Sequence, residues 1–259
     1  MKSRCILKFR FTRSLEVIAC CLLFSAASAN LRPDAELDCS CFDFPNSNFN
    51  RKKNIKSKFG SSPHTGGGLN IGDAVLDFAL NGPDGGESIS LSGLLEDGSP
   101  VLLLWGMWTC PAYQGLGTSK PFDQCSYKHE WDLVEEYGDR VKVVHLVGPE
   151  PHPLAPDTNF DSGTIRMNYW STVRQPRSYK DRAALARKIS EFTHPKAFLL
   201  VDGLGYSQFK NQCVWCTMGL GARTALLISP DGTLVFKQDW FHKESAAKAI
   251  FDLLEKLGI

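Results

Sequence analysis

The sequence has little net charge, no long apolar run and no complete zinc motif. Lys and Arg together number 29 and Asp and Glu number 28, for a net charge of +1, so nothing indicates a nucleic-acid or acidic partner. The apolar run at residues 17–29 is shorter than the about 20 residues that span a bilayer. Cys213 and Cys216 have the spacing of half a zinc site, but no second Cys or His pair stands nearby, so no bound metal is expected.

The first 29 residues have the layout of a secretory signal. Basic residues dominate positions 2–13, the apolar run follows, and Ala27-Ser28-Ala29 offers a small-residue cleavage site before Asn30. We therefore expect a signal or targeting peptide over residues 1–29 and a protein of the secretory pathway or the extracellular space. A plastid or mitochondrial transit peptide and an uncleaved membrane anchor are the alternatives.

Residues 30–69 are expected to form a low-complexity linker, because Asn, Ser, Pro, Gly, Lys and Arg dominate them and few residues could anchor a core. From residue 70 to residue 259 the pattern becomes regular and predicts one folded domain. The hydrophobic content of the chain, 43%, is ample for its core.

Strands and helices alternate along this domain. Apolar runs and alternation predict strands over residues 73–80, 101–104, 141–147, 198–201, 224–228 and 234–237. Helices are predicted over residues 90–95, from residue 111 with interruptions, over 127–137 and 178–192, and at the end of the chain. The helix over 127–137 has Trp131, Leu133 and Val134 as its apolar members. The predicted inner faces of the next two helices are Ala184, Leu185 and Ile189, and then Ala247, Ile250, Phe251 and Leu254. This order predicts an α/β fold with a mixed central sheet and helices on both faces.

Cys110 stands where a buried strand ends and a helix is expected to begin. Residues 101–104 are four consecutive branched apolar residues, which is typical of a strand buried on both faces. Pro111 suits the first turn of a helix. Backbone N–H groups and the helix dipole would then favour the Cys110 thiolate. A reactive thiol is the interpretation that we favour over a buried structural cysteine.

The neighbours of Cys110 argue against two simple thiol enzymes. A thioredoxin-type pair needs a second Cys three positions away, where this chain has Met107 and Tyr113. A peroxiredoxin usually has Thr or Ser at the position of Met107. Of nine cysteines, three fall within residues 1–29, which leaves six (9 − 3) that could form disulfides in an exported chain.

The segment around Cys110 resembles the active-site segment of the iodothyronine deiodinases, with Cys110 in the place of selenocysteine. Two further segments match the same family. VHLVGPEPHP at residues 144–153 places Glu150 and His152 on the family's functional Glu and His, and VRQPRSYKDR at residues 173–182 matches at Arg177, Asp181 and Arg182. The resemblance covers about residues 70–257 and implies a thioredoxin-like fold.

The resemblance implies thyroxine 5'-deiodinase activity. The Cys110 thiolate would attack iodine, His152 would supply a proton to the ring carbon, and Glu150 would orient His152. The substrate would also contact four further residues, Thr109, Tyr113, Arg177 and Arg182. A resolving thiol would then displace iodide, and it would come from Cys125, Cys213, Cys216 or an external reductant.

Three residues depart from the family pattern. Cys110 replaces selenocysteine and is a poorer nucleophile towards iodine. Pro176 falls on the family's second His and can carry no proton, and Gly221 falls on a family Pro before the strand with Arg223. The resemblance therefore supports the fold and the thiol chemistry of the family more strongly than it supports the family's substrate.

We therefore expect a thiol-dependent oxidoreductase that removes halide from an aromatic substrate through Cys110. It would use no bound cofactor and would depend on a thiol reductant such as a thioredoxin or glutathione. A peroxiredoxin-like or disulfide reductase on the same fold is the first alternative, and a non-catalytic redoxin-like binding protein is the second. A homodimer is left open.

Overall fold

The computed structural model describes residues 69–110, 113–114, 126–148, 150, 173–203, 214, 218, 223–238 and 240–259. Several predicted features lie outside the described residues and remain predictions. They are the signal peptide over residues 1–29, nearly all of the linker, the helix start at Pro111, and the side chains of Cys125, His152, Cys213 and Cys216.

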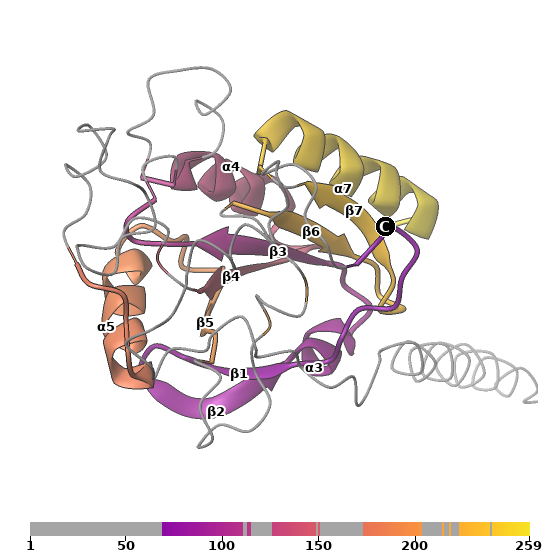
Figure 1. Ribbon diagram of the computed structural model, residues 1–259. Helices are drawn as coiled ribbons and strands as arrows, with labels where there is room; N and C mark the ends of the chain where they lie inside the picture. The colour runs from indigo at the N-terminus through magenta and orange to yellow at the C-terminus, as the bar shows by residue number, and fades with distance from the viewer. Residues whose placement is uncertain are drawn as a thin grey trace, which may run out of the picture.

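A five-stranded mixed sheet forms the centre of the domain (Figure 1). Its order is β5-β4-β3-β6-β7, with bounds Phe198–Val201, Lys142–Val147, Val101–Gly106, Ala225–Ile228 and Leu234–Gln238. Strands β3, β4 and β5 run parallel, whereas β6 and β7 pair antiparallel with their neighbours. All six residues of β3 are buried, as the run of branched apolar residues predicts for a central strand.

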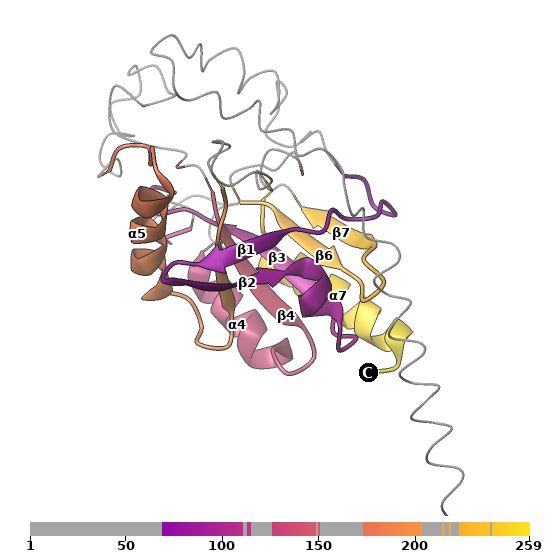
Figure 2. The same cartoon turned by 90° about the horizontal axis from the view of Figure 1, so that it is seen from below.

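Helices cover both faces of the sheet (Figures 1 and 2). Helices α4 (Tyr127–Tyr137) and α7 (Lys243–Leu257) pack on one face, where they share a buried cluster. Helix α5 (Tyr179–Ser190), the short helix α3 (Leu91–Leu95) and the hairpin of β1 (Ala79–Gly82) and β2 (Gly85–Ser90) pack on the other face. Among the described residues, no helix is both long enough and apolar enough to cross a membrane.

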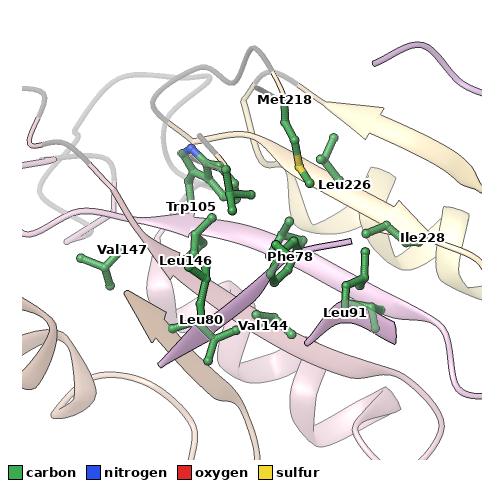
Figure 3. Packing of buried hydrophobic residues seen from close by; sticks show 14 of the residues in the cluster. Phe78, Leu80, Leu91, Trp105, Val144, Leu146, Val147, Met218, Leu226 and Ile228 are labelled. Carbon is green, nitrogen blue, oxygen red and sulfur yellow. The ribbon is translucent and has the colours of Figure 1, made fainter. Parts of the chain in front are cut away.

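The core consists of two clusters separated by the sheet, and β3 supplies both. Leu102 and Leu104 point to the α4–α7 side, while Leu103 and Trp105 point to the side of the hairpin and α5. Figure 3 shows the second cluster, in which Phe78 from the segment before β1 packs near side chains of β3, β4 and β6. Because alternate residues of a strand face opposite ways, a fully apolar strand can anchor both layers.

A parallel β-α-β unit followed by an antiparallel hairpin and a terminal helix, all on one mixed sheet, is the thioredoxin-like fold. The predicted fold class is therefore confirmed. The predicted helix over residues 127–137 is also confirmed at both ends, and α5 begins at a capping box in which Ser178 and Asp181 bond each other's backbone N–H.

Several local predictions are wrong. A strand is predicted over residues 73–80, but β1 begins only at Ala79, because Ala74 makes just an isolated bridge to Thr233. Two residues predicted to face inward lie outside instead: Phe251 is 51% exposed, and Ala184 is exposed. Trp131, an apolar member of the predicted helix over 127–137, is 38% exposed. Neighbouring residues take their places, namely Glu130 on α4, Ala183 and Ala186 on α5, and Ala246 and Leu253 on α7. Helical periodicity fits both settings, and packing on the sheet selects the observed one.

Candidate active site around Cys110

Cys110 lies in the turn that follows β3 and is only 2% exposed. Its backbone N–H donates to Met107 O at 3.2 Å, and its carbonyl accepts from Gln114 N at 3.1 Å. The second bond spans four residues, which is the spacing of an α-helical turn. The thiol therefore lies just after the end of the buried strand, as predicted, whereas the helix expected from Pro111 lies outside the described residues.

Glu150 holds the backbone immediately before Cys110. Its Oε1 accepts from Trp108 N at 3.1 Å, and its Oε2 accepts from Thr109 N at 2.6 Å and from Thr109 Oγ1 at 2.7 Å. The Glu150 N–H in turn donates to Gln175 Oε1 at 2.9 Å. Three segments far apart in the sequence thus meet beside the thiol.

Burial raises the pKa of Glu150 above its usual value, although the hydrogen bonds from Thr109 and Trp108 and the charge of Arg182 lower it. A carboxylate that accepts three hydrogen bonds is firmly held. Glu150 therefore fixes the conformation of the turn, and both of its carboxylate oxygens accept hydrogen bonds from that turn.

Arg223 brings a buried positive charge to the site. It is fully buried, its guanidinium carbon lies 4.7 Å from the centre of the Tyr113 ring, and it donates to the Trp105 carbonyl and to Glu130. Burial lowers the pKa of Arg223, but the charges of Glu130 and Cys110 raise it above its usual value. Because such an interaction is mutual, the guanidinium favours the thiolate form of Cys110.

Glu130 and His145 complete a buried polar group behind Arg223. Both are 1% exposed, and His145 Nδ1 lies 3.0 Å from Glu130 Oε2. The sequence reasoning missed these two residues. The available signal was a His inside the apolar strand β4 and a Glu on the inner face of α4, since buried charges are usually paired.

The Tyr113 ring contacts this group through Arg223, whose guanidinium carbon lies 4.7 Å from the ring centre. Its ring packs against Gly106, where a Cβ would stand 3.4 Å from the Tyr113 Cζ atom. Burial raises the pKa of Tyr113 well above its usual value, and the Glu130 carboxylate raises it further. The phenol therefore stays neutral and protonated.

A row of aromatic rings leads from Tyr113 towards the surface. Tyr127 meets Tyr113 edge-on at 6.2 Å, Phe192 lies 5.2 Å from Tyr127, and Trp108 stacks on Phe192 at 5.9 Å between ring centres. Lys188 Nζ lies 5.2 Å from the centre of the Trp108 ring. Trp108, two positions before Cys110, is thus part of a half-buried aromatic surface, and the Lys188 ammonium group lies over its ring.

The predicted site residues divide into three groups. Thr109, Tyr113 and Glu150 gather around Cys110. Arg182 is fully buried and its Nη1 donates to the carbonyls of Asp202 at 2.9 Å and Gly203 at 2.6 Å, whereas Arg177 is exposed just before α5. His152, Cys125, Cys213 and Cys216 lie outside the described residues.

No described cluster of three or more His, Cys, Asp or Glu residues is arranged to hold a metal ion. What the described site offers is a buried thiol, a buried guanidinium beside it and a turn fixed by a carboxylate. Such an arrangement can stabilise a thiolate and the anion that leaves when the thiolate attacks an electrophile.

No protein-family model matches this sequence, and no curated protein matches it. Solved structures do resemble the fold. A Chlorobium tepidum protein assigned as the thiol:disulfide interchange protein DsbE is 20% identical over 72% of this chain and 99% of its own, with a TM-score of 0.45. Peroxidoxin BcpB from Mycobacterium tuberculosis is 21% identical over 72% and 97%, with a TM-score of 0.42. An uncharacterised conserved protein from Geobacillus kaustophilus is 15% identical over 73% and 85%, with a TM-score of 0.48. These likenesses concern the fold, and the thioredoxin-like assignment rests on the strand order and strand directions of the sheet.

Proposed function

We propose that this protein is a thiol-dependent oxidoreductase in which Cys110 is the nucleophile. One observation carries the proposal: the Cys110 thiol lies at the end of the central strand, within the electrostatic reach of a fully buried arginine. The Arg223 guanidinium pairs with Glu130 and with the Trp105 carbonyl. Its positive charge also favours the thiolate of Cys110, which is the reactive form.

The first reaction that we propose is reduction of a peroxide or a disulfide by Cys110 together with external thiols, a route that needs neither a second Cys at position 107 or 113 nor a hydroxyl side chain at position 107. With a peroxide, the thiolate sulfur attacks one oxygen, the O–O bond breaks, and the leaving oxygen takes a proton from solvent. Cys110 becomes a sulfenic acid. An external thiol then forms a disulfide with Cys110 and releases water, and a second thiol restores the Cys110 thiol.

Reductive removal of iodide from an aromatic substrate is the second candidate. The link from Thr109 through Glu150 to Gln175 favours it, because this link joins the three segments that resemble the deiodinases. Here the Cys110 thiolate would attack iodine, the ring carbon would take a proton from an acid such as His152, and a sulfenyl iodide would form. A reductant thiol would displace iodide to give a disulfide, and a second would restore the Cys110 thiol.

The second reaction is expected to be slow. Sulfur replaces selenium, and Pro176, which is buried, stands where the family has a second His. A phenolic group left without its partner costs roughly 1–3 kcal/mol, which corresponds to a factor of about 5 to 150 in rate.

One assay set separates these possibilities. The purified protein is incubated with excess dithiol and, separately, hydrogen peroxide, a disulfide or an iodinated phenol, and consumption of the first two is compared with iodide release. We expect Cys110→Ser to abolish every turnover and Arg187→Gln, which breaks only an exposed ion pair with Asp84, to leave them unchanged. Faster iodide release from Pro176→His would favour the dehalogenase, and equal activity of Cys110→Ser would rule out both reactions.

A further inference from the structure

Three aromatic rings from distant parts of the chain form a half-buried surface next to Cys110. Trp108 follows β3, Tyr127 opens α4, and Phe192 stands just after α5. The ring centre of Phe192 lies 5.9 Å from that of Trp108 and 5.2 Å from that of Tyr127. All three residues are partly exposed, so this aromatic surface meets solvent where β3 ends between α4 and α5 (Figure 1).

The aromatic surface is tied to the turn that carries the thiol. Trp108 is two residues before Cys110, so their Cα atoms are at most about 7 Å apart. Glu150 Oε1 accepts from Trp108 N at 3.1 Å, which fixes the backbone of Trp108. After the thiol, the Tyr113 carbonyl accepts from Tyr127 N at 2.9 Å, and their rings meet edge-on. A molecule bound on these rings is therefore held beside Cys110.

One cation stands over the aromatic surface. Lys188 is on α5, and its Nζ lies 5.2 Å from the centre of the Trp108 ring. Lys188 is exposed and makes no ion pair within the part of the chain that the structure describes. Its neighbour Arg187, by contrast, is paired with Asp84 at 2.8 Å. The Lys188 charge is therefore available to an anionic group of a ligand that lies against Trp108.

We propose that the aromatic surface and Lys188 select the substrate of Cys110, and that this substrate is an aromatic disulfide with an anionic group on its ring. The planar ring packs on the aromatic side chains, which bury a large apolar area. The anionic group pairs with the Lys188 ammonium. Trp108 and Lys188 are thus specificity-determining residues. The inference names a substrate class for the proposed thiol chemistry and rests on that proposal.

The covalent step is a thiol–disulfide exchange. The Cys110 thiolate, whose proton has gone to solvent, attacks one sulfur of the substrate. A new S–S bond forms, the substrate S–S bond breaks, and the electron pair leaves with the other sulfur as an aromatic thiolate. Cys110 is left in a mixed disulfide, which an external thiol then reduces.

The test measures how fast Cys110 in the reduced full chain forms a mixed disulfide with two reagents. Dithiobis(nitrobenzoate) carries a carboxylate on each ring, whereas dithiodipyridine is aromatic and uncharged at neutral pH. Mass spectrometry of the peptide that contains Cys110 separates this thiol from the other cysteines. Alkylation of Cys110 by iodoacetamide, which is small and uncharged, is measured on every variant. Each disulfide rate is divided by the alkylation rate, so that a change in folding or in the thiol itself cancels.

We expect Lys188→Gln to slow the reaction with dithiobis(nitrobenzoate) by about two- to fivefold, which is the range that an exposed ion pair supplies. The reaction with dithiodipyridine should keep its rate. Arg187→Gln is the matched control, because it removes the same charge from the neighbouring position of α5, and it should change neither rate. Trp108→Leu should slow both disulfides by about two- to tenfold relative to iodoacetamide, because an aromatic contact is lost.

An unchanged rate in Lys188→Gln would overturn the inference, as would equal slowing by Lys188→Gln and Arg187→Gln, which would reflect net charge alone. The same holds if Trp108→Leu keeps the wild-type ratio of disulfide to alkylation rates, or if Cys110 reacts with neither disulfide. The proposed function fails separately, through absence of turnover in the assays above, because the exchange measured here is a single stoichiometric reaction.

Discussion

At the scale of single residues, Arg223 should set how readily Cys110 ionises. We expect Arg223→Met to move the midpoint of Cys110 alkylation by iodoacetamide to higher pH, by up to about one to three pH units, because Arg223 and Cys110 interact electrostatically and a nearby opposite charge favours the ionised form. Rates are measured at a series of pH values. The double variant Arg223→Met with Glu130→Gln should show a smaller rise, because the Glu130 carboxylate that opposes the thiolate is lost as well, and it avoids the about 3–5 kcal/mol cost of an unpaired buried carboxylate.

Arg187→Met is the control for this prediction. Arg187 is also an arginine paired with an acid, Asp84, but the pair is exposed and on another part of the domain. Its loss should leave the alkylation midpoint unchanged. A midpoint that stays in place when Arg223 is replaced would show that the guanidinium does not act on the thiol.

Glu150 should make the protein less stable as the pH rises above 4.5. Its pKa is raised in the folded state from the usual value of 4.5, so the folded protein keeps this proton at pH values where the unfolded chain has lost it. Unfolding then releases a proton, and stability falls with rising pH through this window. The free energy of unfolding, measured with urea from pH 4 to 8, should fall with pH relative to Glu150→Gln.

Glu130 should show the opposite sign and so provides the comparison. Its pKa is held below 4.5 in the folded state by Arg223 and His145. The unfolded chain therefore binds the extra proton, and stability due to Glu130 is present above pH 4.5 and is lost as the pH falls through the folded value. The matching variant is Glu130→Gln. If the wild type loses stability on acidification relative to Glu150→Gln as well as relative to Glu130→Gln, the raised pKa of Glu150 is refuted.

At the scale of elements, α7 offers a direct test of which helix face is buried. Leu254 is 2% exposed and Phe251 is 51% exposed, although the sequence pattern predicts both to face the sheet. We expect Leu254→Ala to cost about 2–5 kcal/mol of unfolding free energy and Phe251→Ala to stay within about 0.5 kcal/mol. Urea denaturation measures both, and comparable losses would mean that the helix is turned towards the predicted face.

Elements with a strong local signal could be predicted from the sequence. Strand β3 reads as buried on both faces because branched apolar residues follow one another without a break. Helix α4 has the predicted bounds, yet Trp131 lies outside, edge-on to His194 at 4.5 Å. The reason is that periodicity fixes the spacing of a helix face, whereas the neighbouring elements decide which of two adjacent faces is covered.

At the scale of the whole molecule, contacts between distant segments explain what the sequence could and could not indicate. Thr109 and Glu150 are 41 residues apart. The sequence could place them in one site because both belong to recognisable segments. The pair of Arg223 and Glu130 is 93 residues apart. Each residue alone looks like an ordinary surface charge, so only the folded sheet reveals their meeting.

The position of Arg223 also has a consequence for how variants of this protein should be screened. Its guanidinium touches the ring of Tyr113 from one core layer and the ring of Phe241 from the other. A library scored by cellular abundance alone would rank Arg223 beside the interior leucines and hide its chemistry. A second score taken with a fluorescent thiol-reactive dye would separate the two contributions, because interior leucines should lower abundance without lowering labelling per folded molecule.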